Sequence, residues 1–373
     1  MAAAAVVVGG FSSEQCEQMR LAMLKGRCEP TFCPDVDTAI ALLGDSKQPV
    51  PQCVLLDTDA PGVEPFIAWM RGEARLFCVP VVAVVARASD AAFVEAHALG
   101  ADDALVAQDL AGLTRRMANL AEFDPSVRPP IVQGRAVIAH PERARRQVLG
   151  RIMRQGGFDV SFAASANELV AISSSGDAPS VVVLSQALPP GTGITAIEAL
   201  RSACERRVPA IVIAAASELA GVTDATDEMG AVGVASDHAP PDDLLFIANE
   251  LLRPDVKNLR ASERRLYGAL CGFRKAGEMG SSYGLTYNIS GEGLYIRTLD
   301  PPPSGVKIWL ELRPPWSPEV VHIRGAVVWV RAVASRGGGA APPGFGVRLS
   351  VDDSAAPDIA SYRAAYETLC AGQ

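Results

Sequence analysis

The first two thirds of the chain alternate short, wholly apolar runs with amphipathic stretches. The apolar runs are Val6–Val8, Val54–Asp57, Val81–Val85 and Ala104–Val106. The stretches with helical periodicity cover residues 13–25, 35–43, 64–74 and 90–98. Strands with no polar face are typical of parallel sheets covered by helices on both sides. The pattern therefore predicts a doubly wound α/β fold, whose functional site lies at the carboxyl ends of the strands.

This pattern occurs twice. Three segments of the first copy return in the second, at offsets of 129, 128 and 130 residues: Val79–Val85 in Val208–Ile213, Cys53–Asp57 in Val181–Ser185, and Leu99–Ala101 in Met229–Ala231. Near-constant spacing of this kind indicates a duplicated structural unit. We expect two α/β domains of similar length, at residues 1–126 and 131–253.

The pattern of apolar and polar residues changes after Arg253-Pro254. Alternating, aromatic-containing segments follow, separated by Pro-rich and Gly-rich turns: Leu285–Tyr287, Gly293–Thr298, Val306–Leu312, Val320–Val330 and Gly344–Leu349. Short strands with such turns are typical of an antiparallel sheet or small barrel. Residues 354–370 then carry apolar side chains at helical spacing. The third domain, residues 259–373, is thus expected to be an antiparallel β-barrel with a C-terminal helix.

Charge is distributed unevenly along the 373 residues. From Pro254 onward there are 14 Lys+Arg and 11 Asp+Glu, which leaves 20 and 31 for the rest, so the net charges are +3 and −11. This balance argues against DNA binding but allows a local site for an anionic ligand. The eight cysteines form no C-x-x-C pair, so we expect reduced thiols and no metal site. No apolar run approaches the roughly 20 residues that span a bilayer, and a cytoplasmic protein is expected.

Two segments of the first copy resemble the receiver domain of bacterial response regulators. Leu55–Gly62 (LLDTDAPG) is similar to the phosphoacceptor strand and its loop, and Ala98–Leu105 (ALGADDAL) to a late helix-to-strand turn. The resemblance covers residues 4–120 and, more weakly, 134–252. It implies two flavodoxin-like receiver domains, with Asp57 at the phosphoacceptor position.

The rest of the receiver chemistry is missing. That family holds Mg²⁺ with an acidic pair after the first strand, where this chain has Gly9 and Gly10. Val85 stands where that family has a hydroxyl residue, and Ala107 stands where it has a lysine. Because a carboxylate without its metal is a poor phosphoacceptor, we interpret Asp57 as vestigial and both domains as pseudo-receivers that dock proteins.

In the second copy, the corresponding positions hold Ala139 with His140, Ser185, Ala214 and Asp237. His140 is expected to be solvated in a loop.

The third domain resembles the PilZ family, over about residues 259–371. Asn288–Gly293 fits that family's (D/N)-x-S-x-x-G turn, and Arg260–Arg264 fits its R-x-x-x-R motif. The resemblance implies binding of cyclic di-GMP by Arg260, Arg264, Asn288, Ser290 and Gly293, with the neighbouring Arg265 as a further candidate. Arginine suits this ligand because its planar fork donates two hydrogen bonds to phosphate or to the guanine edge.

The arginine motif allows more than one register. If Arg264 or Arg265 were its first arginine, the second position would be Gly268 or Ala269. Pairing Arg260 with Arg264 keeps both arginines and is the register that we prefer.

These features predict a non-enzymatic signalling adaptor. No sequence motif of a catalytic, metal or cofactor site is present, and the expected partners are cyclic di-GMP and a protein bound by the pseudo-receivers, with a homodimer as a further option. Two alternatives stay open: a ligand-independent scaffold for a motility, secretion or polarity complex, and a regulator gated by phosphorylation of Asp57.

Overall fold

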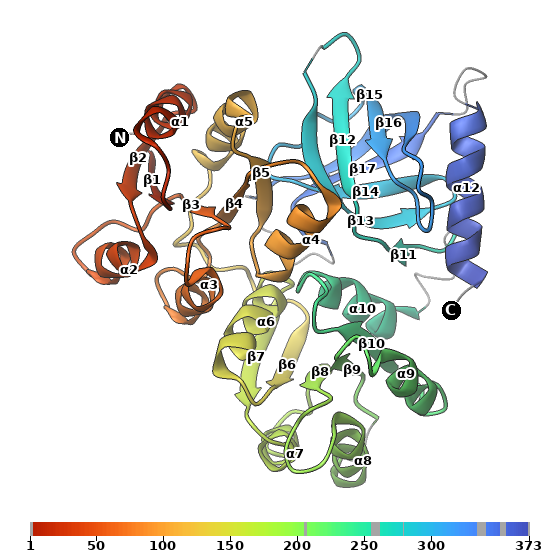
Figure 1. Ribbon diagram of the computed structural model, residues 1–373. Helices are drawn as coiled ribbons and strands as arrows, with labels where there is room; N and C mark the ends of the chain where they lie inside the picture. The colour runs from red at the N-terminus through yellow and green to blue at the C-terminus, as the bar shows by residue number, and fades with distance from the viewer. Residues whose placement is uncertain are drawn as a thin grey trace.

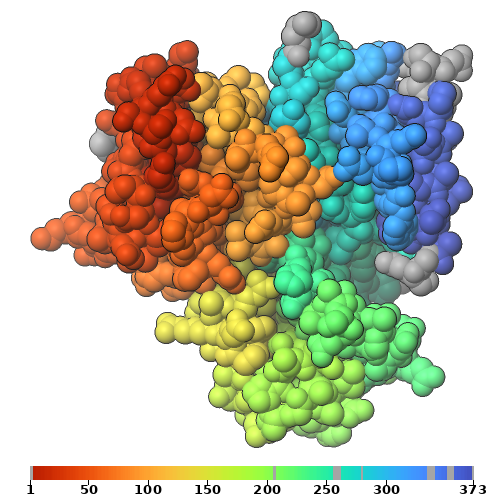
Figure 2. Space-filling model, viewed as in Figure 1, coloured from red at the N-terminus to blue at the C-terminus, as the bar shows by residue number. Residues whose placement is uncertain are grey.

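The computed structural model describes residues 3–204, 207–254, 262–278, 280–333, 341–350 and 356–371. These residues form three lobes that meet near the centre of the molecule (Figures 1 and 2). Among the described residues, no helix is both long and apolar enough to cross a membrane. Arg260 lies outside the described residues.

The first domain is a five-stranded parallel sheet with helices on both faces. Its strands are β1 (Ala3–Val8), β2 (Cys28–Cys33), β3 (Cys53–Asp57), β4 (Val81–Val85) and β5 (Asp103–Val106). Its helices are α1 (Ser13–Lys25), α2 (Val36–Gly44), α3 (Val63–Gly72), α4 (Asp90–Ala98) and α5 (Leu110–Leu120). The strand order β2-β1-β3-β4-β5 is that of flavodoxin-like folds. The predicted fold class is confirmed.

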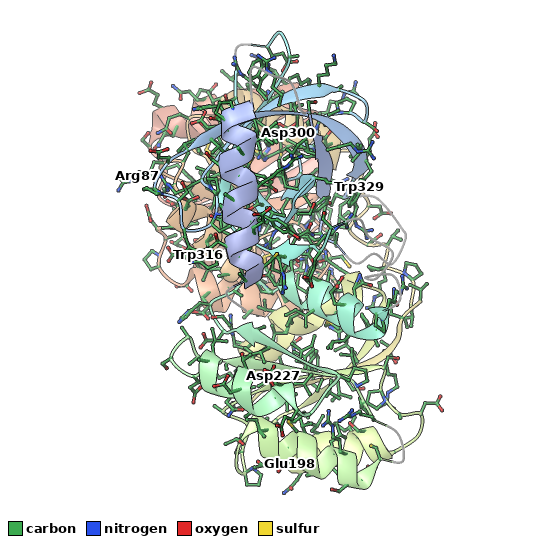
Figure 3. The ribbon with its side chains drawn as sticks, turned by 90° about the vertical axis from the view of Figure 1, so that its right-hand side faces the viewer. Arg87, Glu198, Asp227, Asp300, Trp316 and Trp329 are labelled. Atoms are coloured by element: carbon green, nitrogen blue, oxygen red, sulfur yellow. The ribbon has the colours of Figure 1, made fainter. Side chains whose placement is uncertain are left out.

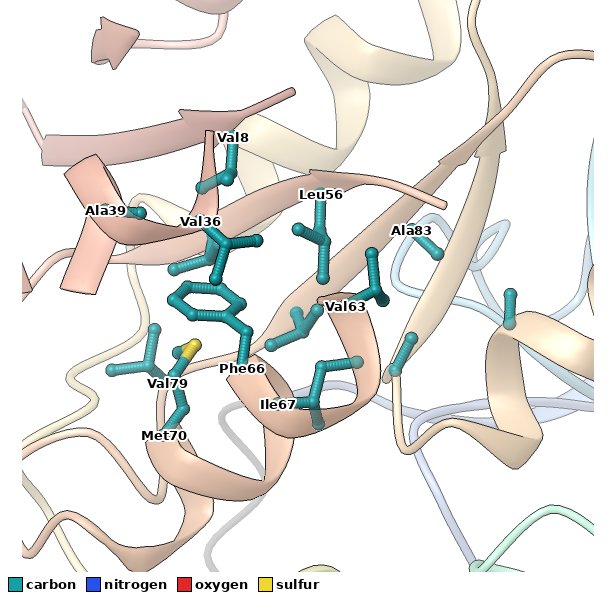
Figure 4. Packing of buried hydrophobic residues seen from close by; sticks show 14 of the residues in the cluster. Val8, Val36, Ala39, Leu56, Val63, Phe66, Ile67, Met70, Val79 and Ala83 are labelled. Carbon is teal, nitrogen blue, oxygen red and sulfur yellow. The ribbon is translucent and has the colours of Figure 1, made fainter. Parts of the chain in front are cut away.

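Successive side chains of the strands enter opposite cores, as the period of two requires. Val6 and Val8 pack under α2 and α3 (Figure 4), whereas Ala5 and Val7 pack under α1 and α5. The hydrophobic pattern did not reveal β2, because only its two terminal cysteines are buried and the residues between them, which include Pro30, are exposed or half-buried. Proline is compatible with this strand because β2 is an edge of the sheet.

The second domain repeats this architecture. Its strands are β6 (Gly134–Ala139), β7 (Phe158–Ala163), β8 (Val181–Ser185), β9 (Ala210–Ala214) and β10 (Val232–Ser236). Its helices are α6 (Arg143–Gln155), α7 (Ala166–Ser174), α8 (Gly193–Ala203), α9 (Leu219–Asp227) and α10 (Asp243–Leu252). The order β7-β6-β8-β9-β10 matches the first sheet strand for strand.

The third domain is a closed antiparallel barrel. Its strands are β12 (Leu270–Lys275), β13 (Ser282–Ser290), β14 (Gly293–Arg297), β15 (Lys307–Leu312), β16 (Val321–Arg331) and β17 (Gly344–Leu349). The ring closes because β13 pairs with both β12 and β14, and the short β11 (Arg265–Leu266) adds to β13. Helix α12 (Ala356–Ala371) packs Ile359, Tyr362 and Tyr366 against the barrel core. The expected barrel and helix are both confirmed.

Hydrogen bonds from a buried ion pair of the first domain, together with shared apolar packing, join that domain to the barrel. The Arg116 guanidinium lies 2.8 Å from the Asp103 carboxylate, and both side chains are almost fully buried. Arg116 also donates to the Tyr283 carbonyl of β13, and the backbone N–H of Leu299 donates to Asp103 at 2.7 Å. Leu285 of the barrel belongs to the apolar core of the first domain.

The second domain is held by two further sets of charges. Arg151 of α6 lies 2.5 Å from Asp102 of the first domain, which also pairs with Arg71. Burial alone would raise the pKa of Asp102, but the two arginines outweigh it and lower that pKa. Toward the barrel, Arg297 of β14 pairs with Asp243 of α10 at 2.9 Å.

Candidate functional site

A groove on the barrel surface runs across β13, β14, β16 and β17; we call it the barrel groove. Its lining residues are Arg264, Asn288, Ser290, Glu292, Gly293, Leu294, Tyr295, Val328, Trp329, Gly346, Val347 and Arg348. The structure thus brings four of the six residues expected at the ligand site to one place. Arg265 is not among the lining residues and instead forms an ion pair with Glu263 at 2.9 Å.

The turn between β13 and β14 forms one end of the barrel groove, and α12 fixes its shape. The Ser290 hydroxyl donates to the Gly293 carbonyl at 3.1 Å. The Tyr362 hydroxyl contacts the carbonyls of Ser290 and Gly293 at 2.9 and 3.0 Å, and Arg363 donates to the Gly291 carbonyl. Ser290 therefore stabilises the turn that presents Asn288 to the groove.

Glycine is required at two lining positions because strands approach closely there. A Cβ on Gly293 would lie 2.1 Å from the Val347 carbonyl oxygen, and one on Gly346 would lie 2.2 Å from Nε1 of Trp329. Gly293 is not in the left-handed region, so glycine is required there by close packing and not by an unusual backbone angle.

Trp329 provides an aromatic surface in the groove. Its ring stacks on Tyr295 with centroids 4.6 Å apart and an interplanar angle of 15°, and 37% of the residue is exposed. Figure 3 labels Trp329 on the barrel, on the other side of α12 from Trp316 in that view. Sequence alternation does not reveal this residue, because an irregularity between Val327 and Trp329 breaks the alternation of β16.

The charged groups of the groove are two arginines and one glutamate. Arg264 lies directly before β11 and Arg348 projects from β17, and both are exposed. Arg348 follows the inward-facing Val347, so strand alternation could have placed it on the outer surface. Two guanidinium groups beside an aromatic plane suit an anionic, planar ligand, and Glu292 can accept hydrogen bonds from base N–H groups.

The phosphoacceptor position of the first domain lacks its usual surroundings. The Asp57 carboxylate accepts a hydrogen bond from the Asp59 backbone N–H at 3.1 Å. Gly9 has φ +147, and a Cβ there would lie 2.4 Å from the Cβ of Asp57 and 3.1 Å from the Phe11 ring. Within the described residues, no group of three His, Cys, Asp or Glu side chains could hold a metal ion. An acidic residue at Gly9 would require the site to rearrange.

The matching region of the second domain is also occupied by local hydrogen bonds. The Ser185 hydroxyl accepts from the Ala187 N–H at 3.2 Å. His140 is buried, contrary to the expectation of a solvated loop histidine, and its Nδ1 accepts from the Glu142 N–H. Burial lowers the pKa of His140. The residue stabilises the turn before α6.

A chain of aromatic contacts leads from the barrel groove to the second domain. The Tyr295 ring, which stacks on Trp329, makes an edge contact with the ring of Tyr287, with centroids 5.8 Å apart. Tyr287 makes an edge contact with Phe246 of α10 at 6.1 Å. Its hydroxyl also donates to the Asp242 carbonyl at 3.1 Å. The groove and the α10 interface are therefore opposite sides of the same layer of rings.

Comparison with known proteins gives only distant similarity. No known family model and no curated protein matches the chain. A probable two-component response regulator/GGDEF domain protein of known structure is 18% identical, covering 68% of this chain and 98% of its own, with a TM-score of 0.32. A receiver domain protein from Clostridium thermocellum is 15% identical, covering 33% and 97%, with a TM-score of 0.30. The Bacillus subtilis inhibitor of motility MotI/DgrA is 17% identical, covering 31% and 52%, with a TM-score of 0.25.

These TM-scores are too low to support a function. The strand order and the residues of each site carry the interpretation instead: two receiver-like α/β domains and a closed six-stranded barrel.

Proposed function

We propose that the chain is a non-enzymatic signalling adaptor whose barrel groove binds cyclic di-GMP. The observation that supports this proposal is the convergence of Arg264, Asn288, Ser290 and Gly293 on one groove. These residues come from two segments about 24 positions apart that were expected to share a ligand. The second receiver-like domain lacks the residues of phosphotransfer and the first keeps only Asp57, so the barrel groove is the better candidate for a sensory site.

The ligand chemistry matches the groove. A cyclic dinucleotide presents two phosphodiesters and two purine rings. Arg264 and Arg348 can donate in pairs to phosphate oxygens or to the O6/N7 edge of guanine. The exposed face of Trp329 can stack on a base, an interaction worth about 1–3 kcal/mol per base. Tyr295 supports the indole from behind, so the stacking surface is already in place before binding.

Calorimetric titration of the full chain with cyclic di-GMP tests this proposal. We expect binding that Arg264→Ala and Trp329→Ala each weaken by at least about tenfold, the loss of one charged hydrogen bond or one stack. Arg265→Ala is the matched control, since its ion pair with Glu263 lies outside the groove, and it should retain affinity. No binding by the folded chain, or equal loss with Arg265→Ala, would contradict the assignment.

The proposed output is a change in how the second domain sits on the barrel. A base stacked on Trp329 would bias the ring layer that ends at Phe246 and Asp242 of the second domain. This coupling requires two arrangements of α10 whose populations the ligand shifts. Hydrogen exchange of α10 should change on ligand addition, and Tyr287→Leu should remove that change while ligand affinity persists.

A ligand-independent scaffold is the second candidate function. The ion pair Arg115–Asp300 links the first domain to the barrel, and the buried pair Arg151–Asp102 links the two α/β domains, both without any ligand. Such links are what a rigid docking platform requires. Titration with cyclic di-GMP separates the two functions. A folded chain that ignores cyclic di-GMP but binds a partner protein would be a scaffold.

A further inference from the structure

A second groove lies at the junction of the two α/β domains; we call it the junction groove. It has a volume of about 590 Å³ and is bordered by the end of α3, the interdomain segment, α6 and strand β7. Figure 1 shows α3 and α6 at this junction, with β7 beyond α6. The barrel groove and the junction groove share no lining residue, so binding at the junction does not depend on whether the barrel binds cyclic di-GMP.

Two arginines in the junction groove share one aromatic ring. The guanidinium carbons of Arg128 and Arg154 lie 5.3 and 5.9 Å from the centroid of Phe77, and Arg154 also lies 5.1 Å from that of Phe162. In the described part of the chain, neither arginine forms an ion pair or donates a hydrogen bond. Burial, and then the charge of Arg128, lower the pKa of Arg154, although Asp159 partly offsets them. Two adjacent cations without hydrogen-bonded partners form a site for carboxylates.

The groove is bordered by an edge strand whose outer hydrogen-bonding groups are available. In the part of the chain that the structure describes, β6 is the one strand paired with β7. The carbonyl of Ala163 accepts from the His140 N–H of the segment after β6, so Ala163 faces inward. Because backbone groups alternate along a strand, those of Phe158, Val160 and Phe162 then point away from β6. Within the described residues, these outward groups make no hydrogen bond to another segment.

The equivalent edge of the first domain is blocked. The registers β1–β2 and β6–β7 place Cys28 opposite Ala3 and Phe158 opposite Gly134, which makes Val160 the counterpart of Pro30. Proline has no N–H to donate and is a common way to prevent strand addition at an edge. The second copy thus has an N–H at the position where the first copy has none.

The apolar walls favour a polypeptide over a small anion. Ile131 lines the groove after Arg128 on the interdomain segment and is 64% exposed. The next residue, Val132, lies beside the groove and is 57% exposed. Phe158 and Phe162 continue this surface onto β7. An extended peptide can satisfy the strand edge, the apolar walls and the two arginines at once.

We propose that the junction groove is a docking site for an extended, acidic segment of a partner protein, which adds as a strand to β7 and places carboxylates on Arg128 and Arg154. Main-chain hydrogen bonds to Val160 and its outward neighbours supply affinity. The arginines and the apolar walls supply specificity for acidic residues beside apolar ones.

Selection of a random peptide library on the full chain tests this proposal. We expect enriched peptides that combine carboxylates with apolar residues, and whose affinity falls by at least about tenfold in Arg154→Ala and in Arg128→Ala. Val160→Pro should abolish binding while the fold persists, because proline replaces an N–H that makes no ladder bond. Circular dichroism and the thermal midpoint verify that this variant folds.

The reciprocal variant Pro30→Val is the matched control and should leave peptide affinity unchanged. Enriched peptides without carboxylates, or peptides that still bind Val160→Pro, would overturn the proposal. A dimer in light scattering that Val160→Pro converts to monomer would also overturn it, because the occupant would then be a second copy of the chain.

Discussion

The two α/β domains share one fold but contact the barrel in different ways. The first domain presents α4, β5 and α5, buries the Arg116–Asp103 pair completely and merges its apolar core with Leu285 and Leu299 of the barrel. The second domain uses the start of α10, where the carboxylates that face Arg297 keep 10–15% of their side-chain surface exposed. The first domain and the barrel therefore form one unit, and the second domain is the part better suited to move.

The largest effect is expected from breaking the first interface. Asp103→Ala leaves the buried Arg116 without its carboxylate and should lower the free energy of unfolding by about 3–5 kcal/mol. Denaturant unfolding of the full chain measures this loss. The double variant Asp103→Leu with Arg116→Met removes both charges and should recover part of it. A cost below about 1 kcal/mol for the single variant would contradict a tightly joined first domain.

A smaller loss is expected at the second interface. Arg297→Met leaves Asp242 and Asp243 without their cation, but these carboxylates reach water or can take up a proton, so we expect a cost of about 2–3 kcal/mol. Hydrogen exchange should rise in α10 and stay low in α5. An equal rise in both helices would mean that the two α/β domains bind the barrel with equal stability.

Acidity should act on the second interface through Asp242. Burial raises the pKa of Asp242 to about 6, although Arg297 opposes the shift. The docked form therefore binds a proton that the undocked form lacks between about pH 4 and 6, and docking strengthens as the pH falls through this window, by about 3 kcal/mol. Exchange rates of α10 across this range measure the effect, and Asp242→Asn should weaken it, since burial also raises the pKa of Asp243 beside the same arginine. A pH dependence unchanged by Asp242→Asn would assign it to another group.

The smallest effect is expected at Asp57, the predicted vestigial phosphoacceptor. Asp57→Asn keeps an oxygen that can accept the Asp59 N–H. The free energy of unfolding should therefore change by less than about 0.5 kcal/mol, and the thermal midpoint should change little. Acetyl phosphate with Mg²⁺ should leave the mass of the wild-type chain unchanged. A gain of one phosphoryl group that Asp57→Asn prevents would instead support the phosphorylation-gated regulator.

Several features followed from local sequence alone. The apolar runs around Val54 and Val81 predicted buried parallel strands because a strand covered on both faces leaves no polar positions. The repeat predicted two similar sheets, and the strand order confirmed them. The N-x-S-x-x-G turn marked the end of the barrel groove, since a turn motif specifies its own local geometry. The domain boundaries, the ligand and the roles of the site residues stay predictions.

Other features depended on contacts between segments far apart in the chain. Trp329 and Arg348 join Asn288 in the barrel groove only because the barrel closes, and the irregularity in β16 hides the direction of Trp329 from any periodic pattern. The burial of Asp103 and Arg116 is decided by which face of the first domain the barrel covers. Likewise, the difference between Pro30 and Val160 matters for strand addition only because both lie on edge strands of their sheets. Local sequence determined the elements and their repeat, whereas the tertiary structure decided which surfaces became interfaces and which remained available, because that choice depends on long-range packing.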